Sequence, residues 1–180
     1  MKAIIPKLLI RLTLMIPITV NGDEADIFTA ARGGDVNAIN ACKAKNCNLN
    51  ARNEEGYTAF ILAAYHNHQK TLTALKLHGA DPCALDPKGN SAMMGVAFKG
   101  YTEIAKWLLE YGKCDVNHQK LAGQTALMMA ALFNREAIIQ LLLAHGAKPD
   151  LADYQGNTAA KLAQAQGLSK VVEIIKFQVQ

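Results

Sequence analysis

The chain has 180 residues, of which 51% are hydrophobic but only 6% are aromatic. This length is enough for one domain with its own core, and the abundance of Ala and Leu favours helices over a β-sandwich or barrel. Three of the 19 basic side chains and none of the 15 acidic ones lie in residues 1–22, so the remainder carries a net charge of +1. Because such a chain lacks the basic surface that nucleic acid requires, we expect no nucleic-acid binding.

Residues 1–22 have the pattern of an export signal. A basic start, MKAIIPKLLIR, precedes a short apolar run, and Val20 and Gly22 supply small residues before a cleavage site. Arg11 leaves an apolar stretch shorter than the roughly 17–25 residues that cross a bilayer. We predict a secretory signal peptide cleaved after Gly22, a periplasmic bacterial protein and no membrane attachment afterwards. An uncleaved inner-membrane anchor and a misassigned start codon are the alternatives.

A unit of about 33 residues recurs through the rest of the chain. Its openings are GYTAFILAA, GNSAMMGVA, GQTALMMAA and GNTAAKLAQ, which begin at Gly56, Gly89, Gly123 and Gly156, with spacings of 33, 34 and 33. A second glycine repeats with the same steps at Gly79, Gly112 and Gly146. Self-similarity at this period indicates a repeat solenoid. We divide a domain over residues 23–180 into units 24–52, 53–85, 86–119, 120–152 and 153–180.

Each unit predicts two helices and a turn. A side-chain oxygen can cap the first helix, and the residues in this place are Thr58, Ser91, Thr125 and Thr158. The second helix carries an apolar stripe, and the second glycine supplies the left-handed residue that ends it. About ten polar or Pro-containing residues, such as ADPCALDPKG, then form a turn to the next unit.

The pattern G-x-T-A-L-x-x-A-A, followed by I-x-x-L-L-L-x-x-G-A-x-x-N/D, resembles the ankyrin repeat over nearly all of residues 24–180. Two positions depart from the Thr-Pro-Leu-His of that family. Alanine replaces the proline, at Ala59, Ala92 and Ala126, and an apolar residue replaces the histidine, at Ile61, Met94 and Met128. The resemblance implies an all-α solenoid of about five helix-turn-helix units joined by β-hairpin-like turns, with atypical end units as caps.

The third unit has one residue more than its neighbours. Eleven steps separate Gly112 from Gly123, where the equivalent glycines in the neighbouring units are ten apart. We therefore expect GKCDVNHQKLAG to form a bulged or longer turn. A tolerated surface insertion explains such a residue, and a functional loop is the alternative.

The sequence contains no recognisable catalytic motif. Neither of its two serines, Ser91 and Ser169, lies in a G-x-S-x-G context, and no phosphate-binding glycine motif is present. His66 and His68 are two residues apart, so on one helix they would point to different faces and could not share an ion. We expect a protein that is not an enzyme and has no metal site and no cofactor.

The four cysteines, Cys42, Cys47, Cys83 and Cys114, contain no C-x-x-C pair, so neither a zinc ribbon nor a thioredoxin motif fits. An even number of cysteines in an exported protein allows disulfides, with three full connectivities. A local bridge between Cys42 and Cys47, and one between Cys83 and Cys114 in the turns of stacked units, are the pairs we consider. The alternative for Cys42 and Cys47 is packing as small apolar side chains.

The family resemblance also implies where a partner binds, because ankyrin-like stacks bind proteins through turn tips and the first helices on their concave side. Carried over unit by unit, it selects these candidate protein-binding residues: Tyr57, Tyr65, His66, Phe98, Lys99, Leu132, Phe133 and Tyr154. Five of these are among the 11 aromatic residues of the chain. Aromatic anchors ringed by polar groups are typical of interface hot spots, and burial of some rings between units is the alternative.

Together these features predict a non-catalytic, monomeric protein that holds one protein partner of unknown identity in the bacterial envelope. Family resemblance suggests that it protects, inhibits or assembles that partner, as an accessory factor for an envelope enzyme or as an immunity protein. A membrane-anchored or secreted effector or scaffold that acts on a host or cytosolic protein is the alternative.

Overall fold

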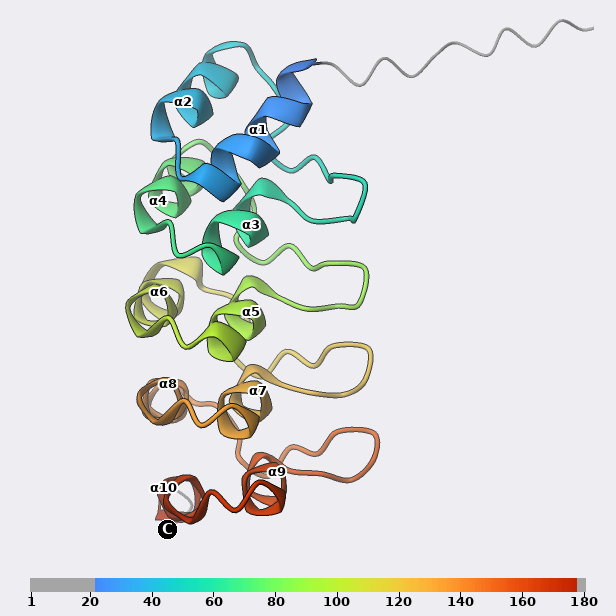
Figure 1. Cartoon of the computed structure of the whole chain (residues 1–180), viewed down its shortest axis with the longest axis vertical. Helices are drawn as coiled ribbons and strands as arrows, with labels where there is room; N and C mark the ends of the chain where they lie inside the picture. The colour runs from blue at the N-terminus through green and yellow to red at the C-terminus, as the bar shows by residue number, and fades with distance from the viewer. Residues whose placement is uncertain (1–21, 178–180) are drawn as a thin grey trace, which may run out of the picture.

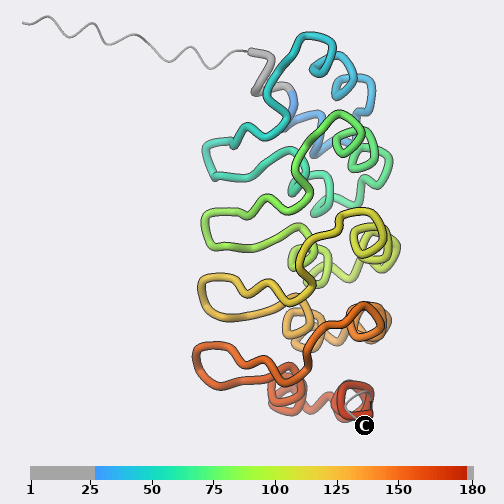
Figure 2. The backbone as a smooth tube through the Cα atoms, turned by 180° about the vertical axis from the view of Figure 1, so that it is seen from behind, coloured from blue at the N-terminus to red at the C-terminus, as the bar shows by residue number. Residues whose placement is uncertain are grey.

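The computed structural model describes residues 22–177, which form a stack of helix pairs (Figure 1). The first helices of the pairs form one column and the second helices another, and hairpin-like loops project from the column of first helices (Figures 1 and 2). Over the described residues there are ten α-helices, one π-helix and no strand, which confirms the all-α repeat solenoid. The first helices are α1 (Gly22–Gly33), α3 (Ala59–Tyr65), α5 (Ala92–Lys99), α7 (Ala126–Leu132) and α9 (Ala159–Ala165). The second helices are α2 (Val36–Ala44), α4 (Gln69–Leu77), α6 (Thr102–Trp107) with its π-helical extension η1 (Leu108–Gly112), α8 (Glu136–Ala144) and α10 (Ser169–Phe177).

The predicted caps are confirmed at the start of α3, α5, α7 and α9. Thr58, Ser91, Thr125 and Thr158 have extended backbone, and each side-chain oxygen accepts a hydrogen bond from the N–H three residues on, at 3.2–3.3 Å. Such a bond satisfies a donor that the helix itself leaves open. The cap residue therefore sets where each first helix begins.

Alanine allows consecutive first helices to pack closely. Ala63, Ala64, Ala97, Ala130 and Ala131 are 0% exposed, and α1, α3, α5, α7 and α9 contact one another in sequence. Larger side chains from the second helices complete one continuous core along the stack, among them Leu72, Ile104, Ile138 and Leu142. Each repeat therefore buries its apolar side chains mainly against its neighbours, as expected for a solenoid.

Hairpin-like turns connect the repeats, and a polar side chain closes most of them. Asn53, Asp86 and Asp153 occupy the same place in three turns, and each accepts a hydrogen bond at 2.8 Å from the N–H four residues on. Isolated antiparallel bridges, such as Arg52 to Thr58, lie at the base of these turns. In the turn before α7 the same place holds Lys120, whose side chain has no hydrogen-bond acceptor.

The extra residue of the third repeat lies in a helix, so the predicted longer turn is wrong. The segment from Asp115 to Gly123 has the same length as the equivalent segment of the preceding repeat. A π-helical turn holds more residues than an α-helical one, and η1 takes up the additional residue at the end of α6.

This π-helical turn also changes how the helix ends. Gly79 and Gly146 are left-handed, with φ of 96° and 85°, as predicted for the residue that ends a second helix. Gly112 is not left-handed, because it is the last residue of η1. Its predicted role passes to Lys113, with φ of 57°.

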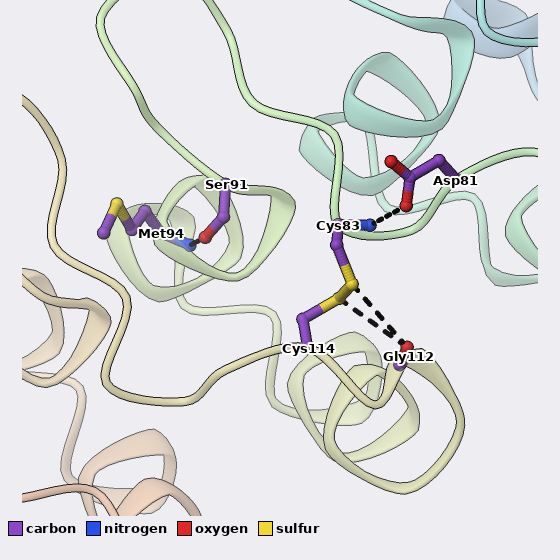
Figure 3. The surroundings of a disulfide bond; sticks show 6 residues. All are labelled: Asp81, Cys83, Ser91, Met94, Gly112 and Cys114. Carbon is purple, nitrogen blue, oxygen red and sulfur yellow. Dashed lines mark hydrogen bonds between the residues drawn. A yellow bond between two sulfur atoms is a disulfide. The ribbon is translucent and has the colours of Figure 1, made fainter.

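The structure joins the cysteines in two disulfides. Cys42 on α2 bonds Cys47 just beyond the end of that helix, and their Cα atoms are 5.4 Å apart. Cys83, in the turn after α4, bonds Cys114, just beyond η1, also with 5.4 Å between the Cα atoms (Figure 3). The second bridge spans 31 positions and links two neighbouring repeats covalently.

The predicted signal peptide lies outside the described residues, except for Gly22, which begins α1. Between residues 22 and 177, none of the helices has both the length and the apolar character that a membrane crossing requires.

Candidate functional site

A groove of about 690 Å³ lies along α3, α5 and α7 and the turns that precede them. Its apolar lining comes from the first helices: Ile61, Leu62, Met94, Gly95 and Met129. Its polar lining comes mainly from the turns: Glu55, Asp86, Lys88, Asn90 and Lys120. An apolar lining bordered by polar groups can bury part of a partner protein and orient it.

Three rings at the C-terminal ends of these first helices form a row that we call the aromatic ladder: Tyr65, Phe98 and Phe133. Tyr65 and Phe98 are stacked, with 6.5 Å between ring centroids and 6° between planes. Phe98 meets Phe133 edge to face at 4.6 Å. Tyr65 and Phe133 are each 37% exposed, so the ladder presents aromatic surface to a partner. Ring–ring contacts orient the three side chains before any partner arrives.

Cationic groups surround one end of the ladder. The Lys99 ammonium lies 4.6 Å from the centroid of the Tyr65 ring, in cation–π geometry. The pKa of His66 is lowered, first by burial and then by the charges of His68, Lys99 and Arg32. His66 is therefore neutral at pH 7 and can offer a partner a hydrogen-bonding ring rather than a charge.

The candidate residues from the sequence divide into three groups. Tyr57, Tyr65, His66 and Phe98 line the groove. Lys99 and Phe133 do not line it but contact Tyr65 and Phe98, which do. Leu132 and Tyr154 do not line it, and Tyr154 is 78% exposed in the last turn, against Gly123.

The placement of His66 and His68 on one helix is wrong. His66 ends α3 and His68 precedes α4, and their rings stack at 6.4 Å. The His68 ring is held by a 2.8 Å hydrogen bond between its Nε2 and the carbonyl of Arg32. Over the described residues, no three His, Cys, Asp or Glu side chains gather as a metal site.

The candidate list from the sequence contains only four residues of the lining, and among those it missed are Met94, Gly95, Lys120 and Met129. An alignment of the units could have singled out two of them. Gly95 is the glycine at the place held by Leu62 and Met129 in the neighbouring repeats, and Lys120 is the lysine at the place of the turn-closing Asn or Asp. Both depart from the pattern of the other units, and both face the same groove.

The comparisons with known proteins agree with this architecture. A family model described as ankyrin repeats (3 copies) matches residues 27–120 and 93–178. The chain belongs to the ankyrin repeat family. Ankyrin repeats generally mediate protein–protein interaction, and the family is a non-enzymatic interaction module.

Three relatives illustrate the range of proteins in which similar repeats occur. The ankyrin repeat protein YahD of Escherichia coli K12 is 28% identical over 196 residues, covering 88% of this chain and 98% of YahD. The ankyrin repeat domain-containing protein SAT10 of Stachybotrys chartarum is 31% identical over 137 residues, and the E3 ubiquitin-protein ligase XBAT33 of Arabidopsis thaliana is 37% identical over 87 residues. These matches cover 76% and 48% of this chain, but only 7% of SAT10 and 17% of XBAT33.

Proposed function

We propose that this ankyrin repeat protein is exported to the bacterial periplasm, where as a monomer it holds one protein partner in the groove. The observation that carries the proposal is the aromatic ladder, because its rings contact one another and two of them, Tyr65 and Phe133, remain 37% exposed. Large, rigid rings of this kind contribute a disproportionate share of the binding energy in protein interfaces. Binding would protect, inhibit or assemble the partner.

Two features support export. Residues 1–22 have the order of a secretory signal, with a basic start followed by a short apolar run. All four cysteines lie in disulfides, which persist in the periplasm but are rare in the reducing cytosol. The same features fit a secreted effector that acts on a host protein, which is the alternative function.

The groove is tested by co-purification with the full chain as it is produced in its own cells. The test variant removes the aromatic ladder: Tyr65→Ala, Phe98→Ala and Phe133→Ala. A matched control removes three exposed apolar side chains of the second helices: Leu77→Ala, Tyr111→Ala and Phe177→Ala. Circular dichroism first establishes that both variants keep their helicity.

We expect one envelope protein to be retained by the wild type and by the control but not by the ladder variant. Retention by all three proteins, or by none, would show that the aromatic ladder is not the binding site. The mature N-terminus tests localisation separately. A chain that starts at Asp23 supports export, an intact Met1 supports a membrane anchor, and recovery from the culture medium supports the secreted effector.

A further inference from the structure

Gly95 lies inside α5, where nothing in the backbone calls for glycine. Its conformation is helical, and the one atom within 4 Å of an added Cβ would be Cδ2 of the exposed Tyr65 ring, at 3.3 Å. Glycine inside a helix is less stable than alanine. The neighbouring repeats carry Leu62 and Met129 at this place, so Gly95 leaves space for a side chain in the lining of the groove.

Lys120, like Gly95, occupies a place where the other repeats carry a residue that favours the local structure. The equivalent Asn53, Asp86 and Asp153 each accept a backbone hydrogen bond that closes the turn, and a lysine ammonium cannot do so. Lys120 instead brings a positive charge to the groove beside Lys88, because the N–H of Leu121 donates to the carbonyl of Lys88 at 3.2 Å.

The two carboxylates of the groove contact other groups and form no ion pair with these lysines. Glu55 pairs with Arg32 at 3.6 Å. Asp86 accepts hydrogen bonds at 2.7–2.8 Å from its own turn, namely from the N–H of Lys88 and from the backbone and side chain of Asn90. In the part of the chain that the structure describes, Lys88, Lys99 and Lys120 form no ion pair with a carboxylate. The groove therefore carries a small excess of positive charge, because Arg32, Lys88 and Lys120 line it against two carboxylates.

We propose that the occupant of the groove is a short acidic segment of the partner that carries one bulky apolar side chain. The apolar side chain enters the space above Gly95, between Leu62 and Met129, and its flanking carboxylates face Lys88 and Lys120. This inference rests on the proposed protein-binding function and specifies the chemistry of the partner. The apolar lining favours a peptide over a nucleic acid, because a phosphate backbone has no apolar group to bury there.

A phage-displayed library of random 12-residue peptides, panned on the full chain, tests the acidic half of the proposal. The test variant is Lys88→Glu/Lys120→Glu. The control is Lys43→Glu/Lys176→Glu, which has the same net charge but changes exposed residues on α2 and α10. We expect the wild type and the control to select peptides that combine Asp or Glu with Phe, Leu or Trp.

The best selected peptide, labelled with fluorescein, then measures affinity by fluorescence polarisation. Reversing the charges at Lys88 and Lys120 should weaken the affinity for the peptide about tenfold or more. The affinity of the control should stay within about twofold of the wild type, because only charges that face the ligand attract and hold it. Binding to the wild type should also weaken as salt rises from 50 to 500 mM, because salt screens exposed charges.

Gly95→Ala tests the apolar half. The added methyl should weaken the labelled peptide severalfold while it raises the melting temperature, because alanine favours the helix and the exposed Tyr65 ring can shift by a few tenths of an ångström. Lost binding in a more stable protein cannot be ascribed to misfolding. Unchanged peptide affinity in this variant would overturn the proposed place of the apolar side chain.

The remaining outcomes separate this inference from the function on which it rests. Peptides that lose binding in the ladder variant but are not acidic, or that ignore the change of Lys88 and Lys120, overturn the acidic partner and leave the binding groove standing. Peptides that bind the ladder variant as well as the wild type overturn the groove itself. A library that yields no peptide overturns the short segment, and a 12-nucleotide oligothymidylate that binds more tightly than any peptide overturns the protein ligand.

Discussion

The last repeat and the repeats in the middle of the stack share one pattern of turns, caps and helices, but the middle repeats depart from it at two places. In the last repeat Asp153 closes the turn, Thr158 caps α9 and no glycine interrupts that helix. In the middle, Gly95 interrupts α5 and Lys120 stands where a turn-closing acceptor belongs. Both exceptions line the groove, which the last repeat does not reach. The two departures from the repeat plan therefore coincide with the groove proposed to bind a partner.

The π-helical turn η1 limits that rule, because it is also an exception in the middle of the stack and does not line the groove. It lies on the second-helix side, where Trp107 and Tyr111 meet at 5.7 Å between ring centroids. It ends directly before Lys113 and Cys114 and so leads into the disulfide that links two repeats (Figure 3). An irregular element in the middle of the stack is therefore not always part of the groove along the first helices.

The largest effect should come from a charge placed in the core next to the last repeat. Leu142 on α8 is 0% exposed, and α8 packs between α6 and α10. Leu142→Asp should destabilise these repeats by about 4 kcal/mol or more, because an unpaired charge is buried. Hydrogen exchange followed by mass spectrometry should show lost protection in α7 to α10, while α1 to α4 stay protected.

The exposed Gln140 on the same helix provides the control. Gln140→Asp should change the free energy of unfolding by less than about 0.5 kcal/mol, because it adds the same charge on the surface. Equal loss of protection in all repeats of Leu142→Asp would contradict the solenoid behaviour on which the comparison of regions depends.

The next largest loss of stability should come from removing the Cys83–Cys114 disulfide, which links two repeats in the middle of the stack. Replacing Cys83 and Cys114 by serine should lower the free energy of unfolding by about 3–4 kcal/mol, because the bridge closes a loop of 31 positions. The Cys42–Cys47 bridge closes a loop of only 5 positions and should contribute about 2 kcal/mol. Urea unfolding with and without a reducing agent measures both, and equal losses for the two pairs would refute the entropic explanation.

A smaller effect should come from giving the turn before α7 the acceptor side chain that Asp153 supplies in the last repeat. Lys120→Asp supplies the missing acceptor and should raise the free energy of unfolding by about 1 kcal/mol, the usual net contribution of a hydrogen bond. Asp86→Lys makes the reverse change in the preceding turn and should lower it by a similar amount. Chemical denaturation of the two variants measures this. If Lys120→Asp is no more stable than the wild type, the lysine does not weaken its turn.

The repeat pattern was enough to predict the helix pairs, because caps such as Thr58 and Ser91 act within three residues of themselves. The repeat pattern could not predict where the extra residue lies, since one insertion can lengthen either a helix or a turn. The packing around Trp107 and Cys114 decides between the two. Register also selected Tyr65 and Phe98, because they occupy equivalent places near the ends of consecutive first helices.

The lining of the groove was less predictable. Which inner positions of a first helix stay accessible depends on how two consecutive helices and their turns stack, and no single unit contains that information. Met94 is buried and still lines the groove, whereas Tyr154, a turn residue chosen by its register, does not line it. The departures at Gly95 and Lys120 were visible in the sequence, but their shared location was not.

The smallest expected effect is a difference between the middle repeats and the last repeat in how their stability depends on pH. The folded pKa of His66 lies below the usual 6.5, first because burial disfavours its charge and then because His68, Lys99 and Arg32 repel the proton. The unfolded chain therefore takes up this proton first as the pH falls, so stability should decline below about pH 6.5. We expect the melting temperature of the wild type to fall between pH 7.5 and 5.5, and less steeply in His66→Gln.

The last repeat should respond only in stronger acid. The pKa of Asp153 lies below the usual 3.8, chiefly because the backbone N–H of Asn157 donates to the carboxylate, with further hydrogen bonds from the Asn157 side chain and the N–H of Gln155. Its stabilising effect is therefore complete above that value and lost as the pH falls through the lower folded pKa. Asp153→Asn should leave the slope between pH 7.5 and 5.5 unchanged and alter it only below about pH 4. If His66→Gln and Asp153→Asn change the melting temperature over the same pH range, the middle and last repeats do not differ in how pH affects their stability. The difference between the two regions would then be limited to the residues that line the groove.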